Sequence, residues 1–378
     1  MLSDYQLTAL TQPIIDIYNQ IEMALLAEVA KRFDVYDKIG GSLEWQLKKL
    51  DELGALTTEA VKVIASMSKR SEQEIAKMLN DASLANIDMD LLQKAYTNGF
   101  IFVDVQKLIQ TEAFRNTIEL SYKSLGQTFK LIKTRALEST RQAYMDIINR
   151  AYIETASGIY DYNTSIRGAL RDMADKGISG ATYRRGNTYV RYSIEGTVRR
   201  DTLTAVNQLA NKGAEKITRE IGADYVEVSA HIGARVSENP IANHAGWQGK
   251  VYKLEGSDPE YPNLKDSTGY PDDIQGLGGV NCRHRMFPFF PGISVPNPHQ
   301  IDEKENKKVY EATQKQRAME RNIRAIKKRL IVAKASGDPK LAKAYRKKLT
   351  QKQAEIEKFC NDNGLRRQTE REMVQEEY

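Results

Sequence analysis

Side chains capable of metal binding or nucleophilic chemistry are concentrated between residues 231 and 284. Three of the four histidines and one of the two cysteines lie there, namely His231, His244, Cys282 and His284. Imidazole nitrogen and thiolate sulfur are ligands of zinc, so these four side chains could bind zinc tetrahedrally. Their intervals of twelve, thirty-seven and one residues match no standard zinc finger. Buried, hydrogen-bonded imidazoles beside a small apolar thiol are therefore the structural alternative, and zinc is the one cofactor that the sequence suggests.

A second alternative is a hydrolase or nuclease, zinc-dependent or not, that uses the cluster of His231, His244, Cys282 and His284. A nucleophilic pair of Cys282 and a histidine is its sharpest form. A predicted strand over residues 281–287 places Cys282 and His284 on one face, because alternate side chains of a strand share a face. The i, i+2 spacing does not by itself supply a third group to orient the histidine; Asp272, Asp273 and Asn281 are the candidates for that role. No helix N-terminus precedes the cysteine to lower its pKa. Gly276–Gly279 leads into a predicted strand, which is not the context of a phosphate-binding loop. The sequence holds no complete catalytic motif, and we predict a protein that is not an enzyme.

The segment that positions these residues, 161–297, has the pattern of a small mixed α/β domain. Helical periodicity from Ser193 to Ile221 ends at Gly222. Alternation of apolar and polar residues then predicts strands at 225–231 and 250–254, in addition to the one at 281–287. Stretches rich in Gly, Pro and Asp separate them, which predicts long, decorated loops.

Residues 1–160 are predicted to be helical almost throughout. Apolar residues recur at three- and four-residue steps from Pro13, where a helix is expected to start. Gly54 is expected to end a short helix, and Ser71 with Glu74 to form a capping box for another. A long helical pattern covers residues 111–160. The chain is therefore predicted to be mostly helical α+β, with domains at 1–160, 161–297 and 298–378.

The third segment, 298–378, is a basic helical tail. Residues 301–378 contain 21 Lys and Arg against 13 Asp and Glu, so the tail carries a net charge of +8 while the whole chain carries +6. Helices are predicted at 306–336 and 340–359, separated by Gly337-Asp338-Pro339. Such a stripe could neutralise phosphates of DNA without reading its sequence, could dock on an acidic partner, or could be a solvated face. The candidate phosphate contacts are Arg321, Arg324, Lys327, Lys328, Arg329, Lys343, Arg346, Lys347 and Lys348.

Several classes of protein are excluded by bulk composition. Two cysteines cannot form the disulfide framework of a small secreted scaffold. No apolar run approaches the length of a membrane-spanning helix, so no membrane partner is expected. The first residues lack the pattern of a secretory signal, which predicts a protein made in the cytoplasm.

Four ordered sequence blocks resemble a known family. They are Ser229–Arg235, His244–Tyr252, Gly276–His284 and Phe287–Gly292. Together they closely resemble the phage minor capsid protein 2 family, which is similar to the MuF-type head morphogenesis proteins of tailed phages.

The resemblance implies a minor structural protein of the phage head, with no settled catalytic activity. It implies association with the portal protein, with other capsid or scaffold proteins and with phage DNA. It also implies a place in the head interior of the virion after assembly in the bacterial cytoplasm. The matching motif residues, expected to form one site or one core, are His231, Arg235, His244, Trp247, Gln248, Asn281, Cys282, Arg283 and His284.

Overall fold

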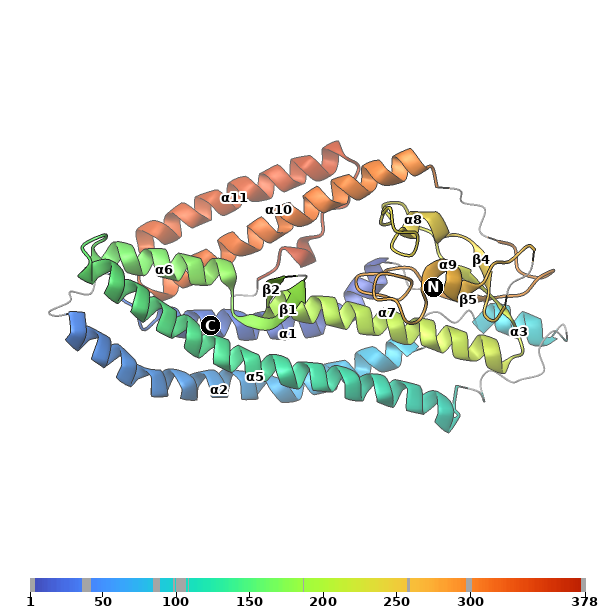
Figure 1. Ribbon diagram of the computed structural model, residues 1–378, viewed down its shortest axis with the longest axis horizontal. Coiled ribbons are helices and arrows are strands. Elements are labelled where there is room, and N and C mark those ends of the chain that lie inside the picture. The colour runs from blue at the N-terminus through green and yellow to red at the C-terminus, as the bar shows by residue number, and fades with distance from the viewer. Residues whose placement is uncertain are drawn as a thin grey trace. The chain divides into compact units, whose positions relative to one another are not determined.

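A computed structural model describes residues 4–35, 42–83, 89–97, 99, 107, 109–185, 187–256, 259–296 and 301–374 (Figure 1). Its helices are α1 (Asp4–Ala30), α2 (Ser42–Ser83), α3 (Met89–Thr97), α5 (Glu112–Ala156), α6 (Tyr162–Lys176), α7 (Ile194–Glu220), α8 (His244–Trp247), α9 (Leu264–Thr268), α10 (Glu303–Ala335) and α11 (Pro339–Asp362), with a 3-10 turn at Thr369–Arg371. Its strands are β1 (Ser179–Arg185), β2 (Thr188–Ser193), β3 (Tyr225–Val228), β4 (Val251–Lys253) and β5 (Met286–Phe289). The prediction of a mostly helical α+β fold is confirmed. Of the helices described, none is long and apolar enough to cross a membrane.

The sequence predicted the long helices more accurately than the residues at which helices begin and end. The helices predicted at 111–160 and 193–221 are confirmed as α5 and α7. The predicted helix start at Pro13 is wrong, because α1 begins at Asp4 and contains Pro13. The predicted helix end at Gly54 is also wrong, because α2 continues through it. Among the described residues, apart from its two chain neighbours and the local backbone of α2, no atom lies within 4 Å of the place that a Gly54 Cβ would take, so the glycine costs only its intrinsic propensity of about 1 kcal/mol.

The predicted capping box at Ser71 is wrong as well. Ser71 lies inside α2, and its hydroxyl donates to the carbonyl of Ser68 at 2.7 Å instead of capping a new helix. Serine side chains make local backbone bonds both at helix starts and inside helices. The residue pattern alone therefore does not distinguish the two.

The chain forms two compact units, each built from three separated stretches. Unit 1 comprises Met1–Pro13, Gln73–Gly126 and Arg199–Gln314, and unit 2 comprises Ile14–Glu72, Gln127–Val198 and Lys315–Tyr378. The division into domains at 1–160, 161–297 and 298–378 stays a prediction, and its second boundary falls at residues 297–300, outside the described residues.

A three-stranded antiparallel sheet is the frame of the motif region in unit 1. Its strand order is β4–β3–β5. Val226 and Val228 of β3 are fully buried in a core that includes Ala214 of α7, Trp247 and Met286. Burying branched apolar side chains on one face of such short strands against a helix is what stabilises so small a sheet.

The strand predicted at 281–287 is wrong in its first half. β5 begins only at Met286, so Cys282 and His284 lie in the loop before it. The predicted strand at 225–231 likewise ends at Val228. In both places the chain leaves the sheet to form turns, and strand geometry therefore does not orient the motif side chains.

A β-hairpin in unit 2 was not predicted. β1 and β2 pair in antiparallel fashion, and Tyr183 contacts Tyr192 edge to face at 5.7 Å between ring centroids. Tyr189 is 74% exposed. No residue of β2 is buried, so this strand lacks the alternation of apolar and polar residues that marks a half-buried strand in sequence.

The basic tail forms the predicted helical hairpin of α10 and α11 (Figure 1). The break at Gly337-Asp338-Pro339 is confirmed: Gly337 has φ +70°, a conformation that glycine tolerates best. The Asp338 carboxylate caps α11 by accepting from Leu341 N at 3.0 Å and also accepts from Arg167 Nε at 2.6 Å. Within unit 2, Ile323 packs with Ile356 in one of the two small apolar clusters of the hairpin.

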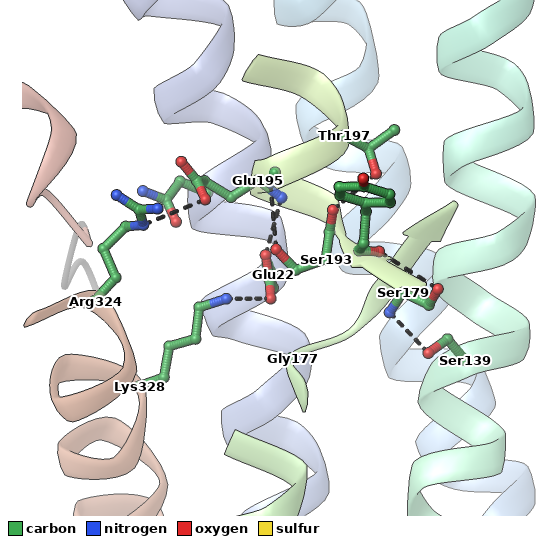
Figure 2. Close-up of polar contacts among 12 residues, drawn as sticks. Glu22, Ser139, Gly177, Ser179, Ser193, Glu195, Thr197, Arg324 and Lys328 are labelled. Atoms are coloured by element: carbon green, nitrogen blue, oxygen red, sulfur yellow. Dashed lines mark hydrogen bonds and ion pairs between the residues drawn. The ribbon is translucent and has the colours of Figure 1, made fainter. Parts of the chain in front are cut away.

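Two buried ion pairs in unit 2 join α10 to α1 and to the start of α7 (Figure 2). Glu22 is fully buried; its Oε1 lies 2.5 Å from Lys328 Nζ, and its Oε2 accepts from the Glu195 backbone N at 3.0 Å. The Glu195 carboxylate, itself buried, lies 3.4 Å from Arg324 Nε. A buried carboxylate is costly unless it is paired, so these cations of the tail are needed inside the protein.

Candidate functional site

Three of the predicted zinc ligands come together in unit 1. One ligand atom each from His244, Cys282 and His284 lies within 4.8 Å of the other two. His284 directs Nδ1 toward Cys282 Sγ at 3.8 Å, while its Nε2 lies 3.0 Å from Gln248 Oε1. His244 Nε2 lies 2.7 Å from the carbonyl oxygen of Gln275. All three side chains are buried, with exposures of 3%, 3% and 1%.

His231 lies beside this triad rather than within it. Its ring stacks on that of His284 with centroids 4.3 Å apart and planes at 22°. Nearly parallel stacked rings direct their in-plane lone pairs side by side and not toward a shared point, so one ion is poorly placed to bind both. The group of potential metal ligands found within the described ranges consists of His244, Cys282 and His284.

Burial keeps the triad uncharged. Desolvation lowers the pKa of His244 to about 4 and lowers the pKa of His284 well below its usual value. It raises the pKa of Cys282 to about 11. At neutral pH, two neutral imidazoles therefore face a protonated thiol.

Two asparagines of α7 hold the loop that carries Cys282 and His284. Asn207 Nδ2 donates to the Cys282 and His284 carbonyls at 3.1 and 3.3 Å. Asn211 Nδ2 donates to the His284 carbonyl at 3.3 Å, and its Oδ1 accepts from Met286 N at 3.0 Å. The sequence could have indicated Asn211, because two asparagines four residues apart share one face of a helix.

Most of the other motif residues hydrogen-bond to the backbone of the loops around the triad. Gln248 Oε1 also accepts from His231 N at 3.0 Å. Trp247 is buried and donates from Nε1 to the Ile241 carbonyl at 3.0 Å. The Arg235 guanidinium donates to the Val280 and Gln275 carbonyls at 3.0 and 3.2 Å. These three side chains fix the positions of loops and leave little free for a ligand.

Asn281 and Arg283 flank Cys282 without joining the triad. Asn281 is exposed and has φ +60°, a left-handed conformation that asparagine tolerates better than most residues. With Cys282 N donating to the Gly279 carbonyl at 3.0 Å, this makes a tight turn. The turn, rather than a strand, brings Cys282 and His284 together.

The Gly276–Gly279 segment is glycine-rich because backbone approaches backbone there. A Cβ at Gly276 would overlap the Thr268 carbonyl oxygen, and one at Gly279 would overlap the Ile274 carbonyl oxygen, both inside the 3.0 Å that real Cβ atoms keep. Leu277 N donates to the same Thr268 oxygen at 3.0 Å, which fixes the close approach. These glycines are therefore needed for the close packing of this loop.

A residue of the tail, Asn306, belongs to the motif region and was missed. Its Oδ1 accepts from Gly233 N and Ala234 N at 2.8 and 2.9 Å, and its Nδ2 donates to the Ala234 carbonyl at 3.1 Å. Asn306 is only 1% exposed. The start of α10 therefore holds the backbone of Gly233 and Ala234, which belong to the first motif block.

The nine basic residues proposed for DNA contact divide into two groups. Four of them are used inside unit 2: Lys328 pairs with Glu22, Arg324 with Glu195, Arg329 with Asp175, and Lys327 donates to the Glu372 carbonyl. The other five are exposed, namely Arg321, Lys343, Arg346, Lys347 and Lys348. Four of these five lie on α11, where none of them contacts an acidic side chain in the part of the chain that the structure describes.

The motif region has few features of a catalytic centre. A reactive cysteine is a partly exposed thiolate with a lowered pKa, whereas Cys282 is buried and its pKa is raised. The potential metal ligands His244, Cys282 and His284 are equally buried. The geometry suits a structural role.

Comparison with known proteins agrees with the motif blocks. The family model for phage minor capsid protein 2 matches residues 2–361. A structural protein of Lactococcus phage LL-H is 26% identical over 346 residues, which cover 87% of this chain and 88% of that relative. A structural protein of Lactococcus phage mv4 is 32% identical over 117 residues, 31% of this chain and 94% of that relative. No solved structure matches the chain. The resemblance seen in the sequence is thus confirmed: the chain belongs to the phage minor capsid protein 2 family and is a structural component of a phage virion.

Proposed function

We propose that this minor capsid protein acts in head assembly in association with the portal protein, inside the head, and that α11 contacts the packaged DNA without reading its sequence. The single observation that carries the DNA contact is the exposed basic face of α11. Other capsid or scaffold proteins are further partners of the same assembly, which takes place in the bacterial cytoplasm.

The charge of α11 is arranged on one side of the helix. Lys340, Lys343 and Lys347 are exposed and spaced three and four residues apart, so they share a face. The buried residues Ala342 and Ile356 lie on the opposite face. A row of unpaired cations at this spacing can neutralise phosphates and release counterions, which gives affinity that depends on salt and not on base sequence.

DNA binding is tested with the full chain, since Asn306 makes a tail deletion harmful to unit 1. We expect a variant with glutamine at Lys340, Lys343, Arg346 and Lys347 to bind duplex DNA at least about tenfold more weakly at low salt, and to lose about one unit of salt slope per lost phosphate contact.

The matched control removes four exposed cations of α2 by the same substitution, at Lys48, Lys69, Arg70 and Lys77. It changes the net charge equally, so it separates a local contact from general attraction. Equal affinities and salt slopes for the two variants would contradict the role of α11.

The portal contact is proposed to lie in the helical region 1–160. Of the eighteen large apolar side chains exposed among the described residues, ten lie in this stretch, which is less than half of the chain. Leu131 and Ile153 of α5 are 60% and 61% exposed. They are separated by roughly six helical turns and therefore face the same side of the helix. Apolar side chains that meet a partner form the core of an interface.

We expect the double variant Leu131→Asp, Ile153→Asp to lower co-purification of the full chain with the portal protein at least about tenfold, because each carboxylate would be desolvated at the contact. Ile274→Asp is the control, since Ile274 is 71% exposed but lies in the motif region. Loss of the portal in the control, or retention in the double variant, would place the contact elsewhere.

A further inference from the structure

We propose that His244, Cys282 and His284 bind one zinc ion, which acts as a structural brace for the motif loops of unit 1. This inference is independent of the portal and DNA contacts. It concerns only the chemistry of three buried side chains and the groups that orient them.

The donor set suits zinc. Two imidazole nitrogens and one sulfur are ligands of a borderline-soft ion that accepts tetrahedral coordination, and hard cations such as Mg²⁺ prefer oxygen. With the ligand atoms within 4.8 Å of one another, small side-chain movements suffice to bring all three into the first coordination sphere of a single ion. Three protein ligands leave a fourth position for water.

The surrounding hydrogen bonds are those of a zinc site. A zinc-bound histidine almost always donates its other ring N–H to a carbonyl or carboxylate oxygen, which fixes its tautomer. Nε2 of His284 meets Gln248 Oε1 at 3.0 Å, so its bare Nδ1 faces Cys282 Sγ. Nε2 of His244 meets the Gln275 carbonyl at 2.7 Å. Gln248 is itself held by the backbone of His231, so the orientation of His284 is fixed before any ion arrives.

The backbone on either side is equally restrained. Asn207 bonds the carbonyls of Cys282 and His284 to α7, and the turn at Asn281 holds Cys282 beside Gly279. Binding breaks the S–H bond of Cys282, forms a zinc–sulfur bond and releases the proton to water, while both imidazoles bind as neutral ligands. The ion would thereby link α8, which carries His244, to the loop before β5.

The test uses the full chain without a polyhistidine tag, treated with a chelator and titrated with Co²⁺ as a spectroscopic substitute for Zn²⁺. We expect a thiolate-to-cobalt charge-transfer band that saturates at one equivalent and is displaced by Zn²⁺. The protein purified from zinc-containing medium should carry about one zinc per chain by elemental analysis.

Variants then locate the site. Cys282→Ser should lose the charge-transfer band, whereas Cys360→Ser, which alters the other buried cysteine, should keep it. His231→Gln should also keep it, because His231 stacks beside the triad. Gln248→Leu should weaken Co²⁺ binding by roughly 10–100-fold through loss of orientation of His284.

No charge-transfer band in the wild-type chain would overturn the proposal, and that result needs no variant to fold. A band that persists in Cys282→Ser and disappears in Cys360→Ser would also overturn it, because the ion would then bind elsewhere.

Discussion

Replacing Lys328 with methionine is expected to lower the free energy of unfolding by about 3–5 kcal/mol. Methionine is also unbranched and reaches as far as the lysine Cε, but it lacks the ammonium group that lies 2.5 Å from the fully buried carboxylate of Glu22. The remaining partner of that carboxylate would be the backbone N–H of Glu195. An uncompensated buried charge is among the most destabilising changes that a single substitution produces. Urea denaturation followed by circular dichroism measures the effect.

Lys62→Met is the matched control, because Lys62 pairs with Glu59 on the surface at 66% exposure. Its expected cost is at most about 1 kcal/mol. Adding Glu22→Gln to Lys328→Met removes both charges, and the double variant should be more stable than Lys328→Met alone. If Lys328→Met costs no more than Lys62→Met, the buried pair does not stabilise unit 2.

Gly276→Ala is expected to destabilise the protein by about 3 kcal/mol, at the upper end of ordinary overpacking. The added Cβ would overlap the carbonyl oxygen of Thr268, which is backbone and already accepts from Leu277 N. To relieve the overlap, the loop must move away from α9 and withdraw Leu277 from its buried place. The same movement displaces the Gln275 carbonyl that orients His244.

Gly54→Ala distinguishes steric overlap from the general effect of replacing glycine. Gly54 lies within α2, and among the described residues no side chain or other segment comes within 4 Å of its Cβ position, so alanine there should stabilise the protein by about 0.5–1 kcal/mol. Thermal denaturation of both variants makes the comparison. Opposite signs are the expected result, and a neutral Gly276→Ala would show that the loop accommodates a side chain.

The spacing of apolar residues predicted the long amphipathic helices. α7, α10 and α11 extend over many turns with a regular apolar stripe, and local signals such as Gly337-Asp338-Pro339 mark real ends. The errors occur where tertiary packing outweighs a local signal. Gly54 is tolerated inside α2 because that helix is long. The hairpin of β1 and β2 has no regular alternation of apolar residues by which the sequence could predict it.

The candidate site was predictable in its residue types but not in its geometry. His244, Cys282 and His284 were identified because those side chains are rare in this chain and cluster in one stretch. The reason given for pairing Cys282 with His284 was a strand, whereas the structure uses a turn. Asn306 could not be found, because an asparagine at a helix start resembles an ordinary cap and its partners lie 72 and 73 residues away.

Each unit is assembled from sequence stretches that lie far apart, and this affects folding during synthesis on the ribosome. Glu22 emerges early, but Lys328 follows it by 306 residues. At bacterial and eukaryotic translation rates this separation takes roughly 15–60 s. Unit 1 likewise waits for residues up to Gln314. Neither unit can be completed before these late residues have been made, so the apolar faces of α1 and α2 must be kept from aggregating until then. Folding of this capsid component is therefore a late event relative to the synthesis of its first helices.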